Sequence, residues 1–599
     1  MLTINDVHQQ FAGFFKSETF QPYAYLVSKK LAEGHICLDL QDVQEELADN
    51  AFYDPNKIMK VGGLRNEPFV STKEEEKKPF VLHNHKLYLQ RYFHYETQIL
   101  DRLRKFTESE ESKIASGISE IKKHADFIGA MFKNSPVNIS NLAIENINWQ
   151  LVAAVTGVLN DFTIITGGPG TGKTTAVSKI LAILYSMNPT LKVALAAPTG
   201  KAAARMGESL KSASSKLPKK IKEKFETITP GTVHRLLRFV HDSPYFRHDK
   251  SNPLNYDIVI IDESSMLDAA LFAKLLNAIG PDTKLILLGD KDQLASVEAG
   301  SLFGDLCKSQ PSFAISKKRA TLINSLITDP SQKISWNFIG DGTDHLLSEH
   351  IVELKRSHRF SSDKGIGKFS RAIINGSQEE LQMFLNNEDE QVTFDNIYDE
   401  KAFEQFVGGY ALYIGEPDIK KALRKLNDLR VLCAVREGEQ GLYAINRKIE
   451  KYLQQKKLIK PMAEFYEHRP IIVTKNYYDL NLFNGDVGII RYDENNILKA
   501  WFEDSSGELR SVLPGFIAEA ETVYAMTIHK SQGSEYGQVL VVLPDADVPL
   551  LTAELLYTAV TRAKTKVIVQ APEVVIVETS QRRVKRASGI MERFSEMTM

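Results

Sequence analysis

One segment constrains the fold of this chain more than any other. It reads Gly167, Gly168, Pro169, Gly170, Thr171, Gly172, Lys173, Thr174 and so has the pattern G-x-x-x-x-G-K-[S/T]. A short β-branched run at 162–166 precedes it, and an apolar helical stretch at 176–185 follows it. In this context glycines let the backbone wrap around phosphates, and amides at the helix N-terminus donate to them. The segment therefore predicts a phosphate-binding P-loop on an α/β domain.

A phosphoryl-transfer site also needs carboxylates at the end of a neighbouring strand. Asp262 and Glu263 directly follow the apolar run 258–261. We expect Asp262 and the Thr174 hydroxyl to bind Mg²⁺, and Glu263 to polarise the attacking water. Lys173 would reach the β- and γ-phosphates of ATP. Such an acidic pair can also cap a helix, and this reading stays open.

Short β-branched runs alternate with helical patterns in two separate parts of the chain. The first block contains 162–166, 192–197, 257–262 and 284–290, and the second contains 430–435, 538–543 and 566–569. Strands that alternate with helices indicate parallel sheets covered on both faces. Within the second block, residues 484–521 carry turn clusters at roughly ten-residue spacing, which is typical of a small β-barrel.

Bulk properties exclude several classes of protein. With 43% hydrophobic and 25% charged residues among 599, the chain has the composition of a globular protein. Its net charge of −2 means that a nucleic-acid site must be a local basic groove. The 3 cysteines form no C-x-x-C pair, so neither a disulfide framework nor a zinc ribbon is predicted. No apolar run approaches the ~20 residues that span a bilayer, and no leader is evident, so we expect a cytoplasmic protein.

Further segments resemble the motifs of superfamily 1 helicases and occur in the same order. They are 197–203 (motif Ia), 231–236 (the T-x-H-x-L element), 262–266 (motif II), 289–294 (motif III), 354–359 (motif IV), 527–535 (motif V) and 557–563 (motif VI). The resemblance implies that Gln150 reads adenine and, with the P-loop residues and Thr175, binds ATP. It also implies that Gln293 senses the γ-phosphate.

The same resemblance assigns catalytic and DNA-binding roles. Arg359 and Arg562 would be arginine fingers supplied by the second α/β domain, so that domain closure completes the site. A lone arginine is more often a solvated or salt-bridged residue than an arginine finger. Mainly phosphate contacts to single-stranded DNA, independent of sequence and sensitive to salt, would come from Thr199, Thr232, His234, Thr527 and His529.

Longer stretches resemble the RecD family more closely than other superfamily 1 members. These are 288–300, 431–438 with 482–488, and the segment 147–150 ahead of the P-loop. The resemblance covers about 90–590. It implies an ATP-dependent 5′→3′ single-strand DNA translocase and helicase. In that family the motor works with RecB-like and RecC-like subunits as a helicase–nuclease on double-stranded DNA ends in recombinational repair.

The resemblance also implies an architecture. We expect an α/β fold with two tandem RecA-like P-loop NTPase domains, at 116–345 and 346–599, and an SH3-like insertion at about 484–521. Residues 1–115 would form a separate N-terminal partner-docking domain. Residues 239–256 lie where the family carries a strand-separating pin, although their aromatic side chains would also suit ordinary packing.

Three alternatives stay open. A free-standing RecD-like helicase would share all of these motifs, but such relatives usually carry helix-hairpin-helix repeats in a longer N-terminal extension. An ATP-gated assembly subunit would bind ATP without unwinding anything. RNA could replace DNA, and competition between the two single strands for ATPase stimulation would distinguish them.

Overall fold

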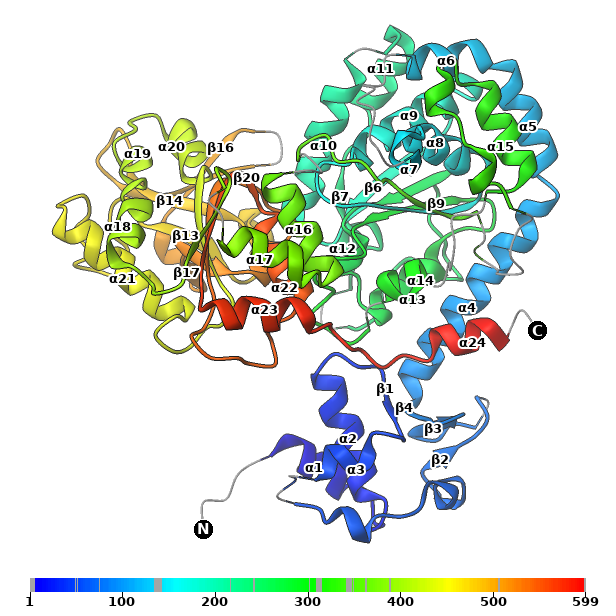
Figure 1. The fold of residues 1–599 in the computed structure, drawn as a ribbon, viewed down its shortest axis with the longest axis horizontal. Coiled ribbons are helices and arrows are strands. Elements are labelled where there is room, and N and C mark those ends of the chain that lie inside the picture. Colours follow the sequence, from blue (N-terminus) through cyan, green and yellow to red (C-terminus); the bar gives the residue numbers. More distant parts are fainter. Residues whose placement is uncertain are drawn as a thin grey trace.

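The computed structural model describes residues 6–48, 50, 52–74, 76–133, 143–215, 217–240, 243–300, 302–308, 315–340, 347, 349–360, 364–386, 389–504 and 507–596. These residues form two units built on parallel sheets, which lie side by side, with a smaller N-terminal unit beneath them (Figure 1). No helix in the described part of the chain is both long and apolar enough to span a membrane.

The first parallel sheet carries the P-loop. Its strand order is β10 (Ile351–Glu353), β5 (Phe162–Thr166), β9 (Lys284–Gly289), β8 (Ile258–Ile261), β6 (Val193–Ala197) and β7 (Gly231–Thr232). Successive strand residues point to opposite faces, so Ile164 and Ile165 join different hydrophobic cores. One face packs against α5 (Ile114–Lys123), α6 (Ala125–Phe132), α8 (Trp149–Leu159), α9 (Lys173–Met187) and α15 (Lys317–Ser325). The other packs against α4 (Gln90–Glu111), α13 (Ala269–Ala278) and α14 (Leu302–Lys308).

The second parallel sheet repeats this design. Its order is β11 (Val392–Asp395), β20 (Ala563–Gln570), β19 (Tyr536–Val542), β12 (Leu429–Cys433) and β18 (Ala525–Thr527). Val541 and Leu540 again enter different cores. The helices on one face are α16 (Gly365–Asn375), α17 (Gln378–Asn386), α22 (Ala553–Val560) and α23 (Glu573–Gln581). Those on the other are α18 (Glu400–Gly408), α19 (Ala411–Ile414), α20 (Ile419–Leu426) and α21 (Leu442–Gln455).

An antiparallel sheet is inserted between β12 and β18 of the second unit. Its order is β16 (Leu509–Val512), β15 (Leu498–Glu503), β14 (Val487–Tyr492), β13 (Pro470–Val473) and β17 (Ala520–Thr522). The sheet begins earlier than the predicted 484, because β13 pairs with both β14 and β17. Residues 505 and 506, which belong to one of the turn clusters predicted within 484–521, lie outside the described residues.

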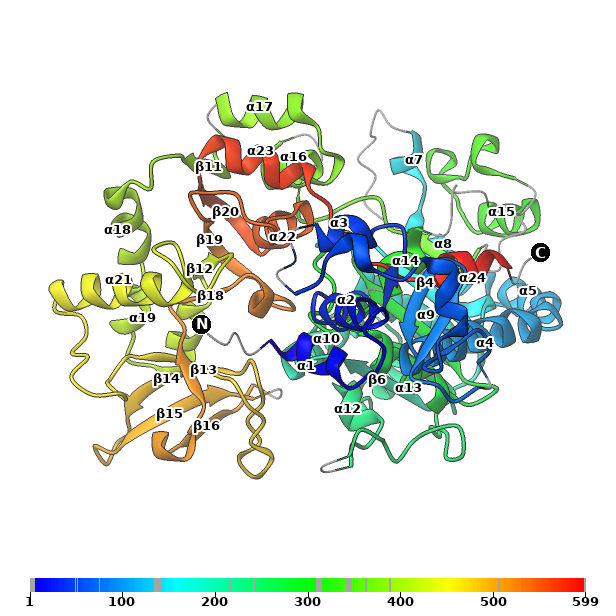
Figure 2. The same ribbon diagram turned by 90° about the horizontal axis from the view of Figure 1, so that it is seen from below.

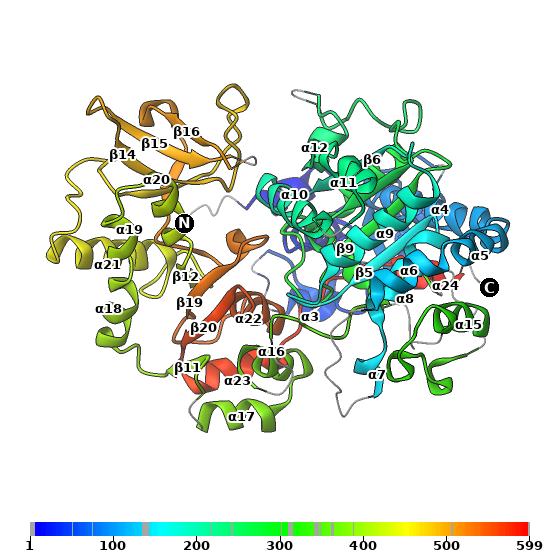
Figure 3. The same ribbon diagram turned by 90° about the horizontal axis from the view of Figure 1, so that it is seen from above.

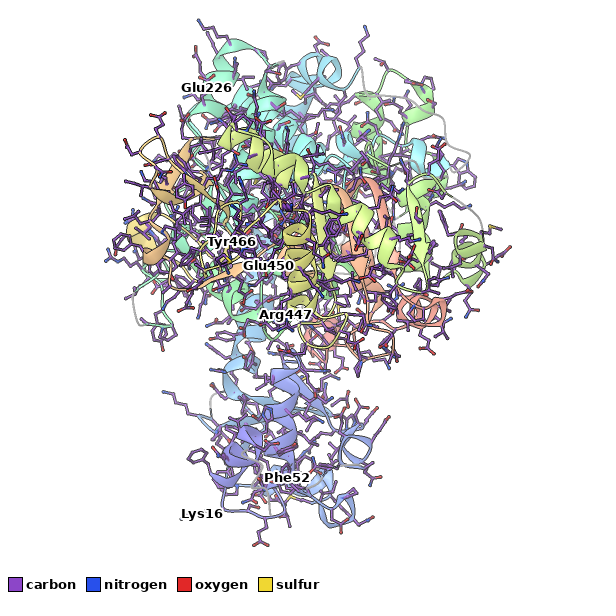
Figure 4. All side chains as sticks on the ribbon, turned by 90° about the vertical axis from the view of Figure 1, so that its left-hand side faces the viewer. Lys16, Phe52, Glu226, Arg447, Glu450 and Tyr466 are labelled. Carbon is purple, nitrogen blue, oxygen red and sulfur yellow. The ribbon has the colours of Figure 1, made fainter. Side chains whose placement is uncertain are left out.

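The N-terminal unit is a mixed sheet with an aromatic core. The sheet order is β1 (Cys37–Asp39), β4 (Lys86–Leu89), β3 (Phe80–His83) and β2 (Val70–Ser71), next to α1 (Val7–Gly13), α2 (Gln21–Ala32) and α3 (Val43–Leu47). Phe15, Phe20 and Phe80 pack edge to face in its core. Figure 4 places Lys16 and Phe52 at the end of this unit farthest from Glu226 and Arg447.

Two segments depart from the predicted domain limits. β10 follows residue 346, yet it pairs with β5 and so belongs to the first sheet. The C-terminal segment leaves the second unit after α23 and ends in α24 (Ile590–Glu596), whose Ile590 and Phe594 are buried in the first unit against α4 and α14. The hydrophobic effect of burying Ile590 and Phe594 in the core of the first unit explains why the C-terminal segment packs against that unit.

Candidate functional site

The P-loop has the geometry that its sequence predicts. β5 ends at Thr166 and α9 begins at Lys173, with Gly170 and Gly172 at φ 75° and 85° between them. The left-handed φ of Gly172 favours glycine, and a Cβ atom there would also force the Gln150 amide to move, since it would lie 2.5 Å from Nε2. Lys173 Nζ donates to the carbonyls of Gly167 at 2.6 Å and Gly168 at 3.3 Å. The loop therefore holds its own lysine at the helix N-terminus.

Most of the predicted nucleotide residues line one cavity of about 980 Å³, whereas Gly167 and Gly168 of the P-loop do not. Its lining includes Gln150, Pro169, Gly170, Thr171, Gly172, Lys173, Thr174, Thr175, Asp262, Glu263, Gln293, Arg359 and Arg562. Most of these residues follow the carboxyl ends of parallel strands, where ligands bind in open α/β sheets. Sequence positions more than 400 residues apart thus meet at a single site.

Two adjacent carboxylates form one wall of this cavity. Asp262 follows β8, and its Oδ1 accepts a hydrogen bond from the Glu263 amide at 2.9 Å. Burial, together with the neighbouring charge of Glu263, raises the pKa of Asp262 to about 6. Glu263 adopts φ 51°, a left-handed conformation, directly after the strand. A hydroxyl from Thr174 and the carboxylate of Asp262 form a hard-oxygen donor set of the kind that Mg²⁺ prefers.

Arg562 reaches the cavity from the second unit. It lies two residues beyond α22 and is 3% exposed. Its guanidinium donates to the carbonyls of Thr558 and Ser534, each at 3.1 Å. Burial lowers the pKa of Arg562, and the nearby charge of Glu263 opposes that shift. The side chain is therefore fixed before any ligand is bound.

Arg359 does not come from the second unit as expected. It lies a few residues beyond β10, and the amide of the preceding His358 donates to the Gly170 carbonyl at 2.8 Å. The pairing of β10 with β5 thus brings Arg359 onto the P-loop side of the cavity. The expectation that both arginines arrive by closure of the second domain is wrong for Arg359.

An ion-pair cluster that we did not predict joins the two sides. Glu535, just before β19, pairs with Arg359 at 2.6 Å and with Arg205 of α10 (Gly200–Ser214). Ala202, Arg205 and Ser209 line the cavity from the same face of α10. That i, i+3, i+7 spacing along one helix face is the sequence signal that could have identified Arg205.

We expect Glu535→Gln to destabilise the protein in a pH-dependent way. The two arginines, against the opposing effect of burial, lower the pKa of Glu535 from 4.5 to about 2. A lowered folded-state pKa contributes stability that is fully present above 4.5 and is lost as the pH falls towards 2. The variant should therefore lose about 3 kcal/mol at neutral pH. In urea unfolding experiments this deficit should shrink below about pH 4.5; a deficit that stays constant would contradict its electrostatic origin.

Motif III is hydrogen-bonded to motifs V and VI. Asp290 Oδ2 accepts from Gln293 Nε2 at 2.9 Å and from the Tyr557 hydroxyl at 3.0 Å. The Leu294 amide donates to Thr558 Oγ1 at 2.9 Å, and its carbonyl accepts from Gln532 Nε2 at 2.6 Å. Gln293, which lines the cavity, is thus connected to Tyr557 of the second unit by two hydrogen bonds that share Asp290.

The predicted DNA contacts fall into two places. Thr199 caps α10 and lies beside Gly533 of motif V. Thr527 is only 6% exposed, so its side chain is largely covered in this structure. His529 follows it, and burial lowers the pKa of that imidazole.

The second place lies at α12 (Val233–Leu236), between the first unit and the antiparallel sheet. Thr232 caps this helix, and His234 contacts the ring of Phe246. Arg235 stacks over Phe483 of the inserted segment, 4.1 Å from the ring centroid. Figures 2 and 3 show α12 and the antiparallel sheet on the same side of the molecule. Phe483 is a candidate that the sequence did not single out.

The predicted pin is a short loop with isolated bridges. Phe239 pairs with Phe246, and Asp249 pairs with Asn252. Tyr245 in this loop is 74% exposed, so its side chain does not serve the packing that we considered as the alternative, whereas Phe246 packs against the core of the first unit as that alternative expects. Residues 241 and 242 lie outside the described residues.

Comparisons with known proteins agree with this geometry. Three family models match: "AAA domain" at 150–299, "UvrD-like helicase C-terminal domain" at 522–582, and "RecBCD enzyme subunit RecD, N-terminal domain" at 3–88. The RecBCD enzyme subunit RecD of Mycolicibacterium smegmatis is 32% identical over 95% of this chain and 92% of its own length. That of Haemophilus influenzae is 34% identical over 74% of this chain and 72% of its own. A solved structure of Bacteroides Pif1 bound to single-stranded DNA is 15% identical, with a TM-score of 0.38, over 75% of this chain and 96% of that one.

The P-loop, the strand-end carboxylates and the two parallel sheets, together with the matched AAA domain and UvrD-like helicase models, define a superfamily 1 helicase. Within that class the similarity extends over nearly the whole chain, including its first 88 residues. The chain belongs to the RecD family.

Proposed function

We propose that this chain is the ATP-driven motor subunit of a RecBCD-type helicase–nuclease and moves 5′→3′ along single-stranded DNA. The observation that carries the proposal is the cavity between the two parallel-sheet units. The P-loop, Asp262 and Glu263 line it from one unit, and Arg562 lines it from the other. Such a site couples phosphoryl transfer to the relative movement of two domains.

Each lining residue has a role in this proposal. The P-loop amides and Lys173 bind the phosphates, and Gln150 reads the adenine. Thr174 and Asp262 would hold Mg²⁺, which supplies charge neutralisation at the phosphates when it is bound. Glu263 orients and deprotonates the attacking water. Arg359 and Arg562 stabilise the negative charge of the transition state, and Gln293 senses the γ-phosphate.

Coupling to DNA follows from the same contacts. Gln293 shares Asp290 with Tyr557, so a change at the γ-phosphate alters a hydrogen bond that joins the two units. Thr199 and His529 lie on the loops of motifs Ia and V, and Thr232, His234 and Phe483 form the second group. We propose that the strand runs past both groups, held by its phosphates and by stacking of bases on aromatic rings. Tyr245 would act at the strand-separating pin.

The N-terminal unit favours a complex over a free-standing helicase. Its first 88 residues match the N-terminal family model of a RecBCD subunit, and the chain covers 92% of the length of such a relative. We propose that this unit docks onto RecB-like and RecC-like partners. A free-standing motor stays the second candidate, because the ATP site alone serves both.

Gentle affinity purification of the tagged chain from its own cells tests the proposal. We expect two larger proteins to co-elute in equal amounts, and the complex to degrade linear duplex DNA only with ATP. The separated chain should unwind 5′-tailed duplexes and leave 3′-tailed ones intact. A chain that elutes alone yet unwinds would support the free-standing helicase. ATP binding without any DNA-stimulated hydrolysis would instead support the assembly subunit.

A further inference from the structure

Lys179 faces the end of the ATP cavity that is occupied by Gln150. It lies on α9, the helix that begins with Lys173, and it lines the cavity. Its Nζ donates to Gln150 Oε1 at 3.0 Å. The same ammonium lies 4.0 Å from the centroid of the Phe132 ring. None of the helicase motifs includes this residue, and the proposed mechanism does not use it.

The environment of Lys179 is costly for a positive charge. Burial lowers the pKa of Lys179 to about 8. Among the residues that the structure describes, no carboxylate forms an ion pair with this ammonium. It donates to the amide oxygen and lies over the ring, and its charge helps to lower the pKa of the nearby His358. A buried ammonium without a counter-ion is unfavourable, although a cation–π contact offsets part of that cost. This cost suggests that Lys179 has a functional role at the cavity wall.

Lys179 fixes the orientation of the Gln150 amide. A glutamine amide has an acceptor side and a donor side and can turn by 180°, whereas an ammonium only donates. The oxygen of Gln150 must therefore face Lys179. Its Nε2 then lies on the other side, 3.4 Å from His358 Nε2 and next to Gly172. Without Lys179, neither orientation of the amide would be preferred in this way.

The orientation of this amide matters for purine recognition. Adenine presents an acceptor at N7 and a donor at its 6-amino group, which match the NH₂ and the oxygen of one glutamine amide. A 6-oxopurine presents acceptors at both positions. A freely turning amide could direct its NH₂ towards both acceptors, but an amide whose oxygen is fixed meets the 6-oxo group with a second acceptor.

We propose that Lys179 is a positioning residue for base selection: by holding the Gln150 amide in one orientation, it makes the site prefer adenine over 6-oxopurine nucleotides. This inference rests on the proposed function, since it assumes that a nucleoside triphosphate binds in this cavity with its base at Gln150. The inference goes beyond the proposed hydrolysis, because an enzyme can hydrolyse nucleoside triphosphates without distinguishing between their bases.

The test compares ATP with inosine triphosphate, which carries an oxo group in place of the 6-amino group. In Lys179→Met, the ratio of kcat/KM for ATP to that for inosine triphosphate should fall by about tenfold, the effect of one hydrogen bond to a charged group. The change should be mainly in KM. Lys179→Arg keeps a donor-only cation and should retain most of the preference. Phe132→Leu removes the aromatic ring that the Lys179 ammonium contacts but keeps the ammonium. This variant should lower the ATP to inosine triphosphate ratio by less than Lys179→Met does.

Two controls separate positioning from a general effect. Lys448→Met removes a lysine that lies 4.5 Å from the Phe403 ring centroid, far along the chain, and should leave the ratio unchanged. In a Gln150→Ala background, Lys179→Met should no longer alter the ratio, because a residue that acts through Gln150 has nothing left to position. Persistence of the full effect in that background would overturn the proposal.

Other results would also overturn it. An equal rise of KM for both nucleotides would show that Lys179 contributes uniform binding. A sharper preference for ATP in Lys179→Met would show that the ammonium itself binds the 6-oxo group. If the parent protein hydrolyses neither nucleotide, the proposed function fails. The inference is then still decided by the equilibrium Kd values of the two nucleotides in parent and variant.

Discussion

Replacing Lys173 by glutamine should reduce DNA-stimulated ATP hydrolysis by about 10²–10³-fold or more, the cost of removing one preorganised donor to a developing oxyanion. Lys173 Nζ is held by the carbonyls of Gly167 and Gly168, so its charge is placed at the P-loop before ATP arrives. Glutamine is one bond shorter than lysine and carries no charge for the β- and γ-phosphates. Steady-state ATPase assays with saturating single-stranded DNA measure the effect.

The fold should survive this change. Lys173 is only half-buried, so water can replace it at the two carbonyls, and the loss of its hydrogen bonds should cost about 1–2 kcal/mol in total. Thermal melting should therefore be close to that of the parent. Lys192→Gln, at an exposed lysine just before β6, is the matched control and should keep full activity. Retained DNA-stimulated turnover in Lys173→Gln would remove the P-loop from the proposed mechanism.

Local patterns predicted the elements around the nucleotide site well. The glycine-rich loop, the apolar runs before it and before Asp262, and the alternation of strands with helices all reflect short-range constraints. Each of these is visible within a window of about ten residues, because turn-forming residues and the periodicity of apolar residues are local features of the sequence. The structure accordingly has β5 and β8 where those patterns indicate strands.

Long-range pairing limited the remainder of the prediction. Nothing in the sequence of β10 reveals that it pairs with β5, almost 200 positions earlier, and this pairing alone brings Arg359 to the P-loop side. The same holds for Glu535, whose partners Arg205 and Arg359 come from distant segments. Turn signals located the antiparallel sheet but missed β13. This strand belongs to the sheet because it pairs with β14 and β17, and the local sequence of β13 does not reveal its partners.

These contacts change how closure of the site is understood. Because Arg359 is already on the P-loop side, Arg562 is the arginine whose distance from the P-loop depends on the position of the second unit. Its guanidinium is fixed by the carbonyls of Thr558 and Ser534, both from that unit. Tyr557, which lies in α22 next to Thr558, donates a hydrogen bond to Asp290 in the first unit. Movement of α22 therefore changes the distance between Arg562 and the nucleotide.

Arg562→Ala should consequently lower kcat by about 10³–10⁵-fold, the range for arginine fingers, while the KM for ATP changes little. The reason is that the proposed role of Arg562 is to stabilise the negative charge that develops in the transition state, whereas the proposed role of the P-loop is ground-state binding of the phosphates. Arg562→Lys should recover only part of the loss, since one ammonium cannot keep both carbonyl contacts and also reach a phosphate. Arg583→Ala, which removes an exposed arginine paired with Glu554, should leave kcat unchanged. A change confined to KM in Arg562→Ala would instead make Arg562 a binding residue and leave transition-state stabilisation to Arg359 and Lys173.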